Sequence, residues 1–303
     1  MRIISLLPSA TELLFAIGAG DEVVGVTHEC DFPPEARSRP ALTSSLLDHG
    51  GRPSSVIDRH IKAALHQGSS LYGLDERRLA ELRPDLIVTQ ELCRVCAVAY
   101  TEVDRAVRRL HGSVPVVSLE PSSVEDVCGT ALTLGRLTGH LAEAEALVAD
   151  MRRRMTAVER LPRPRSRPAV ACIEWTDPIM AGGHWVPEMV ARAGGRDVLG
   201  VDGQPSVEVA WQRLRDAAPE VMVLMPCGFD LDRTLEAAPE VTMRPGYADL
   251  PCARSGRVVA VDGSSYFNRP GPRIVAGLEI LAAALRRQPS EPLPPGAAWV
   301  PAA

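Results

Sequence analysis

The sequence is poor in the residues that mark several common kinds of protein. It contains a single lysine, Lys62, and no basic run longer than the three arginines 152–154, and its formal net charge is −5. A basic patch is the electrostatic signature of proteins that bind nucleic acid or an anionic membrane surface. The composition therefore predicts no nucleic-acid partner and no electrostatic attraction to membranes.

Long hydrophobic runs are also absent. No stretch approaches the ~20 apolar residues of a membrane-spanning helix, so no membrane insertion is predicted. The opening residues, Met1 to Pro8, contain an apolar run too short for a signal-peptide core, and no nearby cysteine offers a site for a lipid anchor. On these grounds we expect a cytoplasmic protein. In a reducing compartment, its seven cysteines are expected to be thiols, metal ligands or redox groups rather than disulfides.

Motifs of common enzymes are missing as well. The sequence contains no phosphate-binding glycine loop, no dinucleotide fingerprint and no Ser/His/Asp arrangement. These absences argue against an ordinary ATPase, dehydrogenase or hydrolase. They favour a binding protein that is not an enzyme.

What remains has the composition of a globular α/β protein. The 303 residues are 46% hydrophobic and 23% charged, which is enough for two domains. Short apolar runs alternate with amphipathic segments, as where a helical pattern over residues 74–82 precedes the apolar run 86–88. This alternation predicts parallel sheets covered by helices. Since such sheets bind ligands outside the carboxyl ends of their strands, we expect site residues in the segments that follow each strand.

Two segments of the sequence repeat each other. Arg83-Pro84-Asp85-Leu86-Ile87-Val88 and Ala218-Pro219-Glu220-Val221-Met222-Val223 both place a proline and an acidic residue before an apolar run. Between them, apolar residues keep helical spacing from residue 122 to about residue 161, a length that suits a helix joining two domains. We therefore predict an N-terminal α/β lobe over residues 1–121, a connecting long helix and linker over 122–167, a C-terminal α/β lobe over 168–288 and a poorly ordered proline-rich tail over 289–303.

The chain resembles the class III substrate-binding proteins, which serve ABC importers of cobalamin, haem and ferric siderophores. The resemblance rests on the opening Arg2-Ile3-Ile4-Ser5-Leu6-Leu7-Pro8-Ser9-Ala10-Thr11-Glu12, on the two repeated segments and on the long helical stretch. It covers roughly residues 1–288 and is greatest toward cobalamin-binding members. It implies two Rossmann-like lobes with parallel sheets joined by one long helix, a ligand cleft between the lobes, and an ABC importer as partner.

Cysteine and histidine gather after two predicted strands of the N-terminal lobe. Cys93 and Cys96 form a Cys-x-x-Cys pair, and His28 and Cys30 follow an earlier strand. Three interpretations are open. The pair can perform thiol-disulfide chemistry, it can join His28 and Cys30 in a Cys3His zinc site, or its thiols can be free and partly buried.

Other polar and aromatic residues at strand ends are candidate ligand contacts. Those of the N-terminal lobe are His28, Glu29, Gln90 and Glu91. The carboxylates of Glu29 and Glu91 can instead be solvated loop groups or charges at helix ends. In the C-terminal lobe, two of the four tryptophans stand among charged residues in a chain that is only 4% aromatic, which favours a stacking surface for a flat or cyclic ligand. These candidates are Glu174, Trp175, His184, Trp185 and Glu188. His184 can coordinate a metal centre or simply begin a helix.

The loop after the last predicted strand completes the candidate site. Tyr266, Phe267, Asn268 and Arg269 offer aromatic surface, an amide and a guanidinium that suits carboxylate or phosphate groups. We predict a non-catalytic protein that binds a small molecule, namely a corrinoid such as cobalamin or another metal-bearing ring compound. The alternative is a cytoplasmic thiol-redox or zinc-binding protein on the same scaffold.

Overall fold

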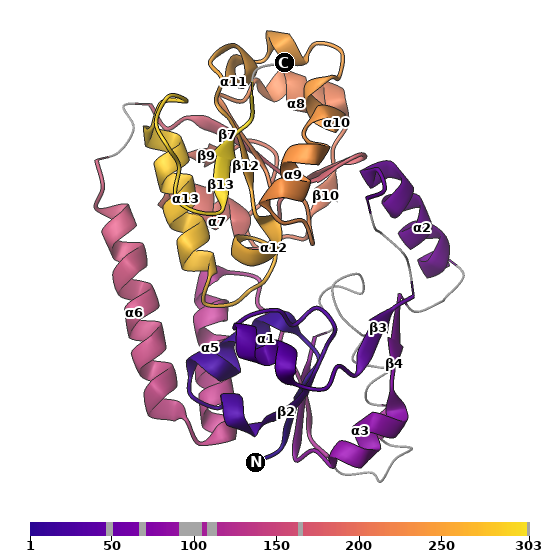
Figure 1. Cartoon of the computed structure of the whole chain (residues 1–303). Coiled ribbons are helices and arrows are strands. Elements are labelled where there is room, and N and C mark those ends of the chain that lie inside the picture. The colour runs from indigo at the N-terminus through magenta and orange to yellow at the C-terminus, as the bar shows by residue number, and fades with distance from the viewer. Residues whose placement is uncertain (47–50, 67–70, 91–104, 108–113, 163–165, 302–303) are drawn as a thin grey trace. The chain divides into compact units, whose positions relative to one another are not determined.

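The computed structural model describes residues 1–46, 51–66, 71–90, 105–107, 114–162 and 166–301. The chain divides into two compact units (Figure 1). The N-terminal unit comprises Met1–Arg52, Arg59–Pro121 and Glu125–Asp150. The C-terminal unit comprises Pro53–Asp58, Ser122–Val124 and Met151–Ala303.

The N-terminal unit is built on a four-stranded parallel sheet in the order β2-β1-β5-β6. Its strands are β1 (Ile3–Ser5), β2 (Val23–Val26), β5 (Leu86–Thr89) and β6 (Val116–Ser118). Every residue of β1 and β5 is buried, as expected for central strands covered on both faces. Ile4 and Ile87 share one core cluster with Leu79 of α3 (Glu76–Leu82).

The other elements of this unit surround the sheet. They include a two-stranded antiparallel sheet, two short 3-10 helices and two α-helices. These are β3 (Thr43–Ser45) with β4 (Tyr72–Leu74), η1 (Gly20–Glu22), η2 (Pro34–Ser38), α1 (Pro8–Ala16) and most of α5 (Val124–Thr138). Helix α2 (Ser54–His66) is shared, because its residues up to Asp58 belong to the C-terminal unit.

The predicted single long connecting helix is wrong, since the structure forms two helices there. Helix α5 ends at Thr138, and α6 (Leu141–Glu159) begins three residues later. Gly139 adopts φ +80°, a left-handed conformation that glycine accepts readily and that ends helices. Gly135 lets the two helices approach closely, because a Cβ there would lie 2.5 Å from the Cβ of Ala144. None of the described helices is long and apolar enough to cross a membrane.

The C-terminal unit repeats the parallel core and extends it. Strands β7 (Ala169–Thr176), β9 (Arg196–Asp197), β11 (Val221–Leu224) and β12 (Val258–Val261) pair in parallel in the order β9-β7-β11-β12. Three antiparallel strands are added at the edges: β8 (Ile179–Ala181), β10 (Val207–Glu208) and β13 (Ala297–Trp299). These parallel sheets confirm the predicted α/β fold class.

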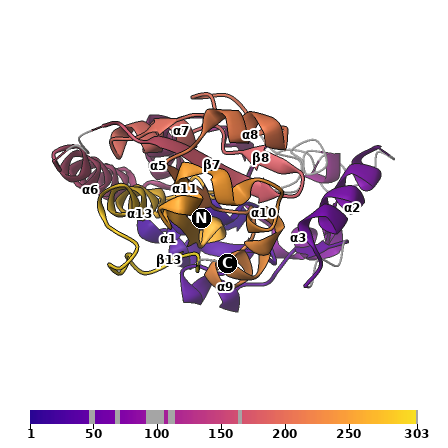
Figure 2. The same ribbon diagram turned by 90° about the horizontal axis from the view of Figure 1, so that it is seen from above.

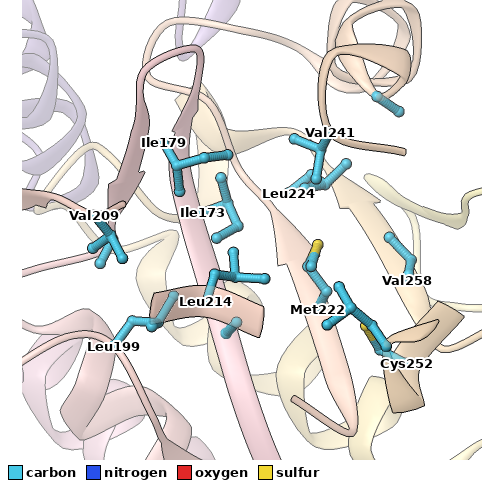
Figure 3. Packing of buried hydrophobic residues seen from close by; sticks show 14 residues of the cluster. Ile173, Ile179, Leu199, Val209, Leu214, Met222, Leu224, Val241, Cys252 and Val258 are labelled. Carbon is cyan, nitrogen blue, oxygen red and sulfur yellow. The ribbon is translucent and has the colours of Figure 1, made fainter. Parts of the chain in front are cut away.

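One core cluster of the C-terminal unit lies against one face of this sheet (Figure 3). Ile173, Met222 and Leu224 pack there with Leu214 of α8 (Trp211–Ala217) and Val241 of α10 (Pro239–Thr242). Figure 2 shows α8, α10, α11 (Pro251–Arg254) and α13 (Ile274–Arg286) from above. The remaining helical elements are α7 (Val186–Arg192), α9 (Leu231–Ala237), η3 (Tyr247–Asp249) and α12 (Gly263–Tyr266).

The proline-rich tail is not the poorly ordered segment predicted from its composition. Strand β13 pairs with β12 through Trp299 and Val259, and the Trp299 indole donates a hydrogen bond to the Glu291 carbonyl at 2.8 Å. Gly296 lies against the ring of Tyr266. The tail is structured because the edge of β12 offers it backbone hydrogen-bond partners, which composition alone does not reveal.

Candidate ligand-binding site

Glu174 lies at the carboxyl end of β7, where the pairing with β8 shifts register between Ile173 and Trp175. Such bulges change the direction of side chains and are frequent near functional sites. The Glu174 carboxylate accepts hydrogen bonds from the Ser206 hydroxyl at 2.7 Å and from the Gly183 amide at 3.3 Å. Burial nevertheless raises the pKa of Glu174, because it disfavours the charged carboxylate. A carboxyl group is thus held in a fixed orientation at a strand end.

His184 follows β8 and has an unusual backbone conformation. Its φ of +51° lies in the left-handed region, and its amide donates to the Gln204 carbonyl at 2.6 Å. Burial lowers the pKa of the imidazole, so the ring is neutral at pH 7. Within the described part of the chain the imidazole makes no hydrogen bond. A neutral, half-buried imidazole of this kind is able to bind a metal ion through a ring nitrogen.

Trp175 combines an aromatic contact with a hydrogen-bonding role. Its ring lies 5.4 Å from that of Phe229, centroid to centroid, at a tilted angle of 58°. Its indole nitrogen donates to the Asp177 carbonyl at 3.1 Å and to the Ser54 carbonyl at 3.3 Å. The side chain is therefore fixed at the strand end while remaining partly exposed.

Trp185 and Glu188 have structural surroundings instead. Trp185 is only 5% exposed, and its indole donates to the Phe267 carbonyl at 2.8 Å. Glu188 accepts from the Val124 amide at 2.8 Å, which caps the first turn of α5, and also pairs with Arg192. These contacts account for both residues without a ligand.

The loop after α12 is divided between core and surface. Phe267 is fully buried, and Tyr266 lies near Arg273, whose guanidinium carbon is 5.9 Å from the ring centroid. The Asn268 amide nitrogen donates to the Met225 carbonyl at 3.4 Å, whereas its side-chain oxygen is buried and has no hydrogen-bond partner among the described residues. Arg269 is partly buried. Asn268 therefore keeps an acceptor available at the end of β11.

In the N-terminal unit, His28 is held at the end of β2. One ring nitrogen, Nδ1, lies 2.7 Å from the Thr43 hydroxyl, and the other, Nε2, lies 3.3 Å from the Glu29 carboxylate. The ring of Tyr72 lies 5.6 Å away at 50°. His28 and Glu29 form a polar pair next to the two-stranded sheet of β3 and β4.

The thiol of Cys30 points into a different environment. It is 4% exposed and lies 3.1 Å from the Thr11 hydroxyl and 3.2 Å from the Thr27 hydroxyl. Gln90 is also buried, at 4% exposure. Glu91, Cys93 and Cys96 lie outside the described residues. Across the described ranges, no group of three or more His, Cys, Asp and Glu side chains is arranged to hold a metal ion.

Several residues at the carboxyl end of β7 were not predicted from the sequence. Ser206 binds Glu174, and Thr176 contacts Ser54 and Glu240. These partners come from separate loops and helices and carry no shared motif. Phe229 was within reach of prediction, since it follows β11 just as Trp175 stands at the end of β7.

Comparison with solved structures defines the class of protein to which this architecture belongs. The chain is similar to a possible iron-binding, periplasmic solute-binding protein from Staphylococcus epidermidis, with a TM-score of 0.71, 22% identity, and coverage of 94% of this chain and 98% of the other. A periplasmic vitamin B12-binding protein of Vibrio cholerae matches with a TM-score of 0.67, 20% identity, and coverage of 94% and 96%. A periplasmic haem-binding protein from Roseiflexus matches with a TM-score of 0.69, 23% identity, and coverage of 94% and 97%. The fold is that of two-lobed solute-binding proteins.

Sequence comparison identifies the family. The profile of the periplasmic binding proteins matches residues 3–264, and the chain belongs to this family. It is 27% identical to a cobalamin-binding protein of Halobacterium salinarum over 287 residues, which are 93% of this chain and 68% of the relative. It is 22% identical to a vitamin B12-binding protein of Vibrio parahaemolyticus over 274 residues, 90% of this chain and 84% of the relative. The predicted resemblance to class III substrate-binding proteins is confirmed.

Family membership corrects two expectations. The predicted cytoplasmic location is wrong, because the family consists of periplasmic binding proteins, which work outside the cytoplasm. That prediction depended on where the sequence begins, which is not evidence of location. The thiol-redox and zinc-binding alternative gains no support either. The prediction that the protein binds rather than catalyses is confirmed, because family members are substrate-binding proteins.

Proposed function

We propose that this protein binds a corrinoid, or another metal-bearing ring compound such as haem, and presents it to an ABC importer. The names of its relatives support this proposal, since they describe binders of cobalamin, vitamin B12 and haem. The observation that carries it is His184, a neutral imidazole with no hydrogen-bond partner among the described residues, at the edge where α/β sheets bind ligands.

The C-terminal unit supplies residues for three kinds of ligand contact. The His184 imidazole is placed to coordinate the metal centre of the ligand. Trp175, which is partly exposed, offers an aromatic surface to a flat ring, and Phe229, only 8% exposed, packs against it. The buried side-chain oxygen of Asn268 is able to accept a hydrogen bond from a ligand amide.

Further contacts are proposed from the remaining strand-end residues. Those on the same unit are Glu174, Tyr266 and Arg269, and those of the N-terminal unit are His28, Glu29, Gln90 and Glu91. The pair of His28 and Glu29 is fixed by Thr43, which suits directional hydrogen bonds to polar groups at the ligand periphery. Trp185, Phe267 and Glu188 have roles in the core or in helix capping that explain them fully.

The test is titration of the purified protein with hydroxocobalamin and with haemin, followed by visible absorbance. We expect saturable binding of one of them, and His184→Ala is expected to shift the absorption spectrum and to weaken binding at least ~10-fold, or about 1.4 kcal/mol. His140→Ala is the matched control, because His140 bonds to Glu22 in the other unit. Binding of neither compound contradicts the proposed function, and an unchanged spectrum in His184→Ala contradicts coordination by this residue.

A further inference from the structure

A short segment from the first half of the sequence is docked in the C-terminal unit. We call residues Pro53–Asp58 the strap; it carries the first turn of α2. Ser54 in the strap is fully buried. Its amide donates to the Glu240 carboxylate at 3.0 Å, its hydroxyl lies 2.7 Å from the Thr176 hydroxyl, and its carbonyl accepts from the Trp175 indole at 3.3 Å. The backbone amide, the carbonyl and the hydroxyl of Ser54 are thus all satisfied by this unit.

The receiving groups are held in place by contacts that do not involve the strap. The Thr176 hydroxyl lies 2.5 Å from the Glu240 carboxylate. Arg244 donates to the Glu240 carbonyl at 2.9 Å, to the Thr176 carbonyl at 3.0 Å and to the Asp177 carboxylate at 2.9 Å. Since these bonds connect α10 to the end of β7, the site keeps its geometry when Ser54 leaves. Such preorganisation favours binding of a replacement.

The chemistry of the receiving groups defines what can replace Ser54. A carboxylate accepts from an N–H donor, an indole N–H donates to a carbonyl oxygen, and a hydroxyl binds either kind of group. A primary or secondary amide presents the same N–H and carbonyl as the Ser54 backbone. Buried polar groups must stay paired, so an occupant without an N–H donor would leave the Glu240 oxygen that accepts from Ser54 unsatisfied, although Thr176 keeps its bond to the other carboxylate oxygen. The subsite therefore selects amide-bearing ligand groups over apolar ones.

We propose that Ser54 occupies a ligand subsite in the unliganded protein, and that an amide group of the ligand displaces it and releases the strap. This inference rests on the proposed function, because corrinoids carry amide groups around their ring. The strap and the ligand then compete for Thr176, Glu240 and Trp175. The subsite is separate from His184 and adds specificity for the periphery of the ligand rather than for its metal centre.

The first experiment measures hydrogen exchange of the strap in the unliganded protein. Glu240→Ala removes the acceptor of the Ser54 amide and should speed exchange of strap amides roughly tenfold or more, the range for hydrogen bonds to charged groups. Glu236→Ala is the matched control, because Glu236 is exposed on the preceding helix and pairs only locally with Arg233. Equal rates of hydrogen exchange at the strap amides in both variants would contradict the proposal that Glu240 holds the strap in place. Loss of protection in β11 would reveal misfolding, and Ser54→Ala then takes the place of Glu240→Ala.

The second experiment compares the affinity of Ser54→Ala and Thr176→Val for hydroxocobalamin. Ser54→Ala removes the hydroxyl that contacts Thr176, so the strap should dock more weakly and hydroxocobalamin should bind several-fold more tightly. Thr176→Val removes a hydroxyl of the subsite itself, so hydroxocobalamin should bind several-fold more weakly. Strap exchange should also rise when the ligand is added to the wild type. The proposed subsite would be wrong if the two variants changed the affinity for hydroxocobalamin in the same direction or not at all. It would also be wrong if adding the ligand left the hydrogen exchange of the strap unchanged. Either result leaves the proposed function intact. If the wild type binds neither hydroxocobalamin nor haemin, the proposed function fails and the subsite fails with it.

Discussion

The two units share a parallel core but differ in what is added to it. The order β2-β1-β5-β6 in the N-terminal unit corresponds to β9-β7-β11-β12 in the C-terminal unit. Among the described residues, only the C-terminal unit continues a strand of its parallel core into an antiparallel hairpin, formed by β7 and β8. Trp175 and Thr176 lie in the extended end of β7, and His184 follows β8. The candidate residues of that unit thus come largely from its additions, while the shared core serves as the scaffold.

The shared part extends to individual backbone bonds. Arg83 and Ala218, each before a proline, both adopt φ +43° at the end of a helix. The next acidic residue then makes two bonds to the start of the first strand. The Asp85 amide donates to the Arg2 carbonyl and its carboxylate accepts from the Arg2 amide, at 2.8 and 2.7 Å. Glu220 makes the same pair of bonds with Ala169, at 2.8 and 3.1 Å.

The largest expected difference between the units is in how much stability a glycine-to-alanine substitution costs where a helix makes a close contact. Gly277→Ala on α13 would press a methyl group into the Tyr266 carbonyl and should lower the free energy of unfolding by about 2–3 kcal/mol. Gly135→Ala meets the methyl group of Ala144 and should cost about 1–2 kcal/mol. Gly129→Ala on α5 is the control, because among the described residues no atom beyond its own helix backbone and chain neighbours lies within 4 Å of a Cβ built at this position. This substitution should raise the free energy of unfolding by about 0.5–1 kcal/mol. Urea unfolding measures all three, and equal effects would show that these contacts are not tight.

The matching hydrogen bonds of Asp85 and Glu220 should contribute unequally to the free energy of unfolding. Glu220→Ala is expected to lower the free energy of unfolding by about 1–2 kcal/mol, because its bond to the Ala169 amide is partly buried. Asp85→Ala should cost only about 0.5–1 kcal/mol, since the bond to Arg2 is exposed to water. Thermal unfolding of the two variants checks this order. A larger loss in Asp85→Ala would mean that exposure does not distinguish the two bonds.

Arg83 and Ala218, the left-handed residues before the two prolines, allow a test in which the expected effects on stability are small and equal. Arg83→Gly and Ala218→Gly relieve the strain of a side chain at positive φ, partly offset by the greater freedom of glycine in the unfolded chain. Each should raise the free energy of unfolding by about 0.5 kcal/mol. Because the two conformations match, the gains should be equal in urea unfolding. A gain in one variant and a loss in the other would break the equivalence of the units.

The pH dependence of stability should have opposite signs at two glutamates, one in each unit. The hydrogen bond from His140, at 2.8 Å, lowers the pKa of Glu22 below its ordinary 4.5, so its stabilisation is lost as pH falls below that value. Burial raises the pKa of Glu174, so folding favours the protonated form and stability falls as pH rises above 4.5.

Unfolding measured across this pH range distinguishes the two glutamates. Glu22→Gln should reduce the loss on the acid side, and Glu174→Gln should reduce the loss on the alkaline side. Glu145→Gln serves as a control, because Glu145 is exposed on α6. Identical pH profiles in wild type and Glu174→Gln would show that burial does not control this carboxyl group.

Much of the fold was predictable because its signals are local. The apolar run at residues 86–88 forms β5 (Leu86–Thr89), and the apolar run after Glu220 forms β11 (Val221–Leu224). Both are continuous apolar runs with turn residues on either side. The short strands β9 and β10 were missed, because two-residue strands carry no periodic pattern. The long helix was predicted as one because apolar spacing continues through Gly139, and only the backbone conformation of that residue ends α5.

The candidate site shows where local reasoning stops. The pattern of the sequence was enough to predict that polar residues follow the strands, and hence to predict Glu174, Trp175 and His184 at the carboxyl edge of the C-terminal sheet. That Trp185 and Phe267 belong to the core is visible only in the folded protein, because burial depends on what packs against a side chain. The partners of the site, such as Ser54 and Glu240, are 186 residues apart in sequence. Spacing along the chain describes neighbours within a strand or helix, whereas hydrogen bonds between such distant residues exist only once the chain has folded.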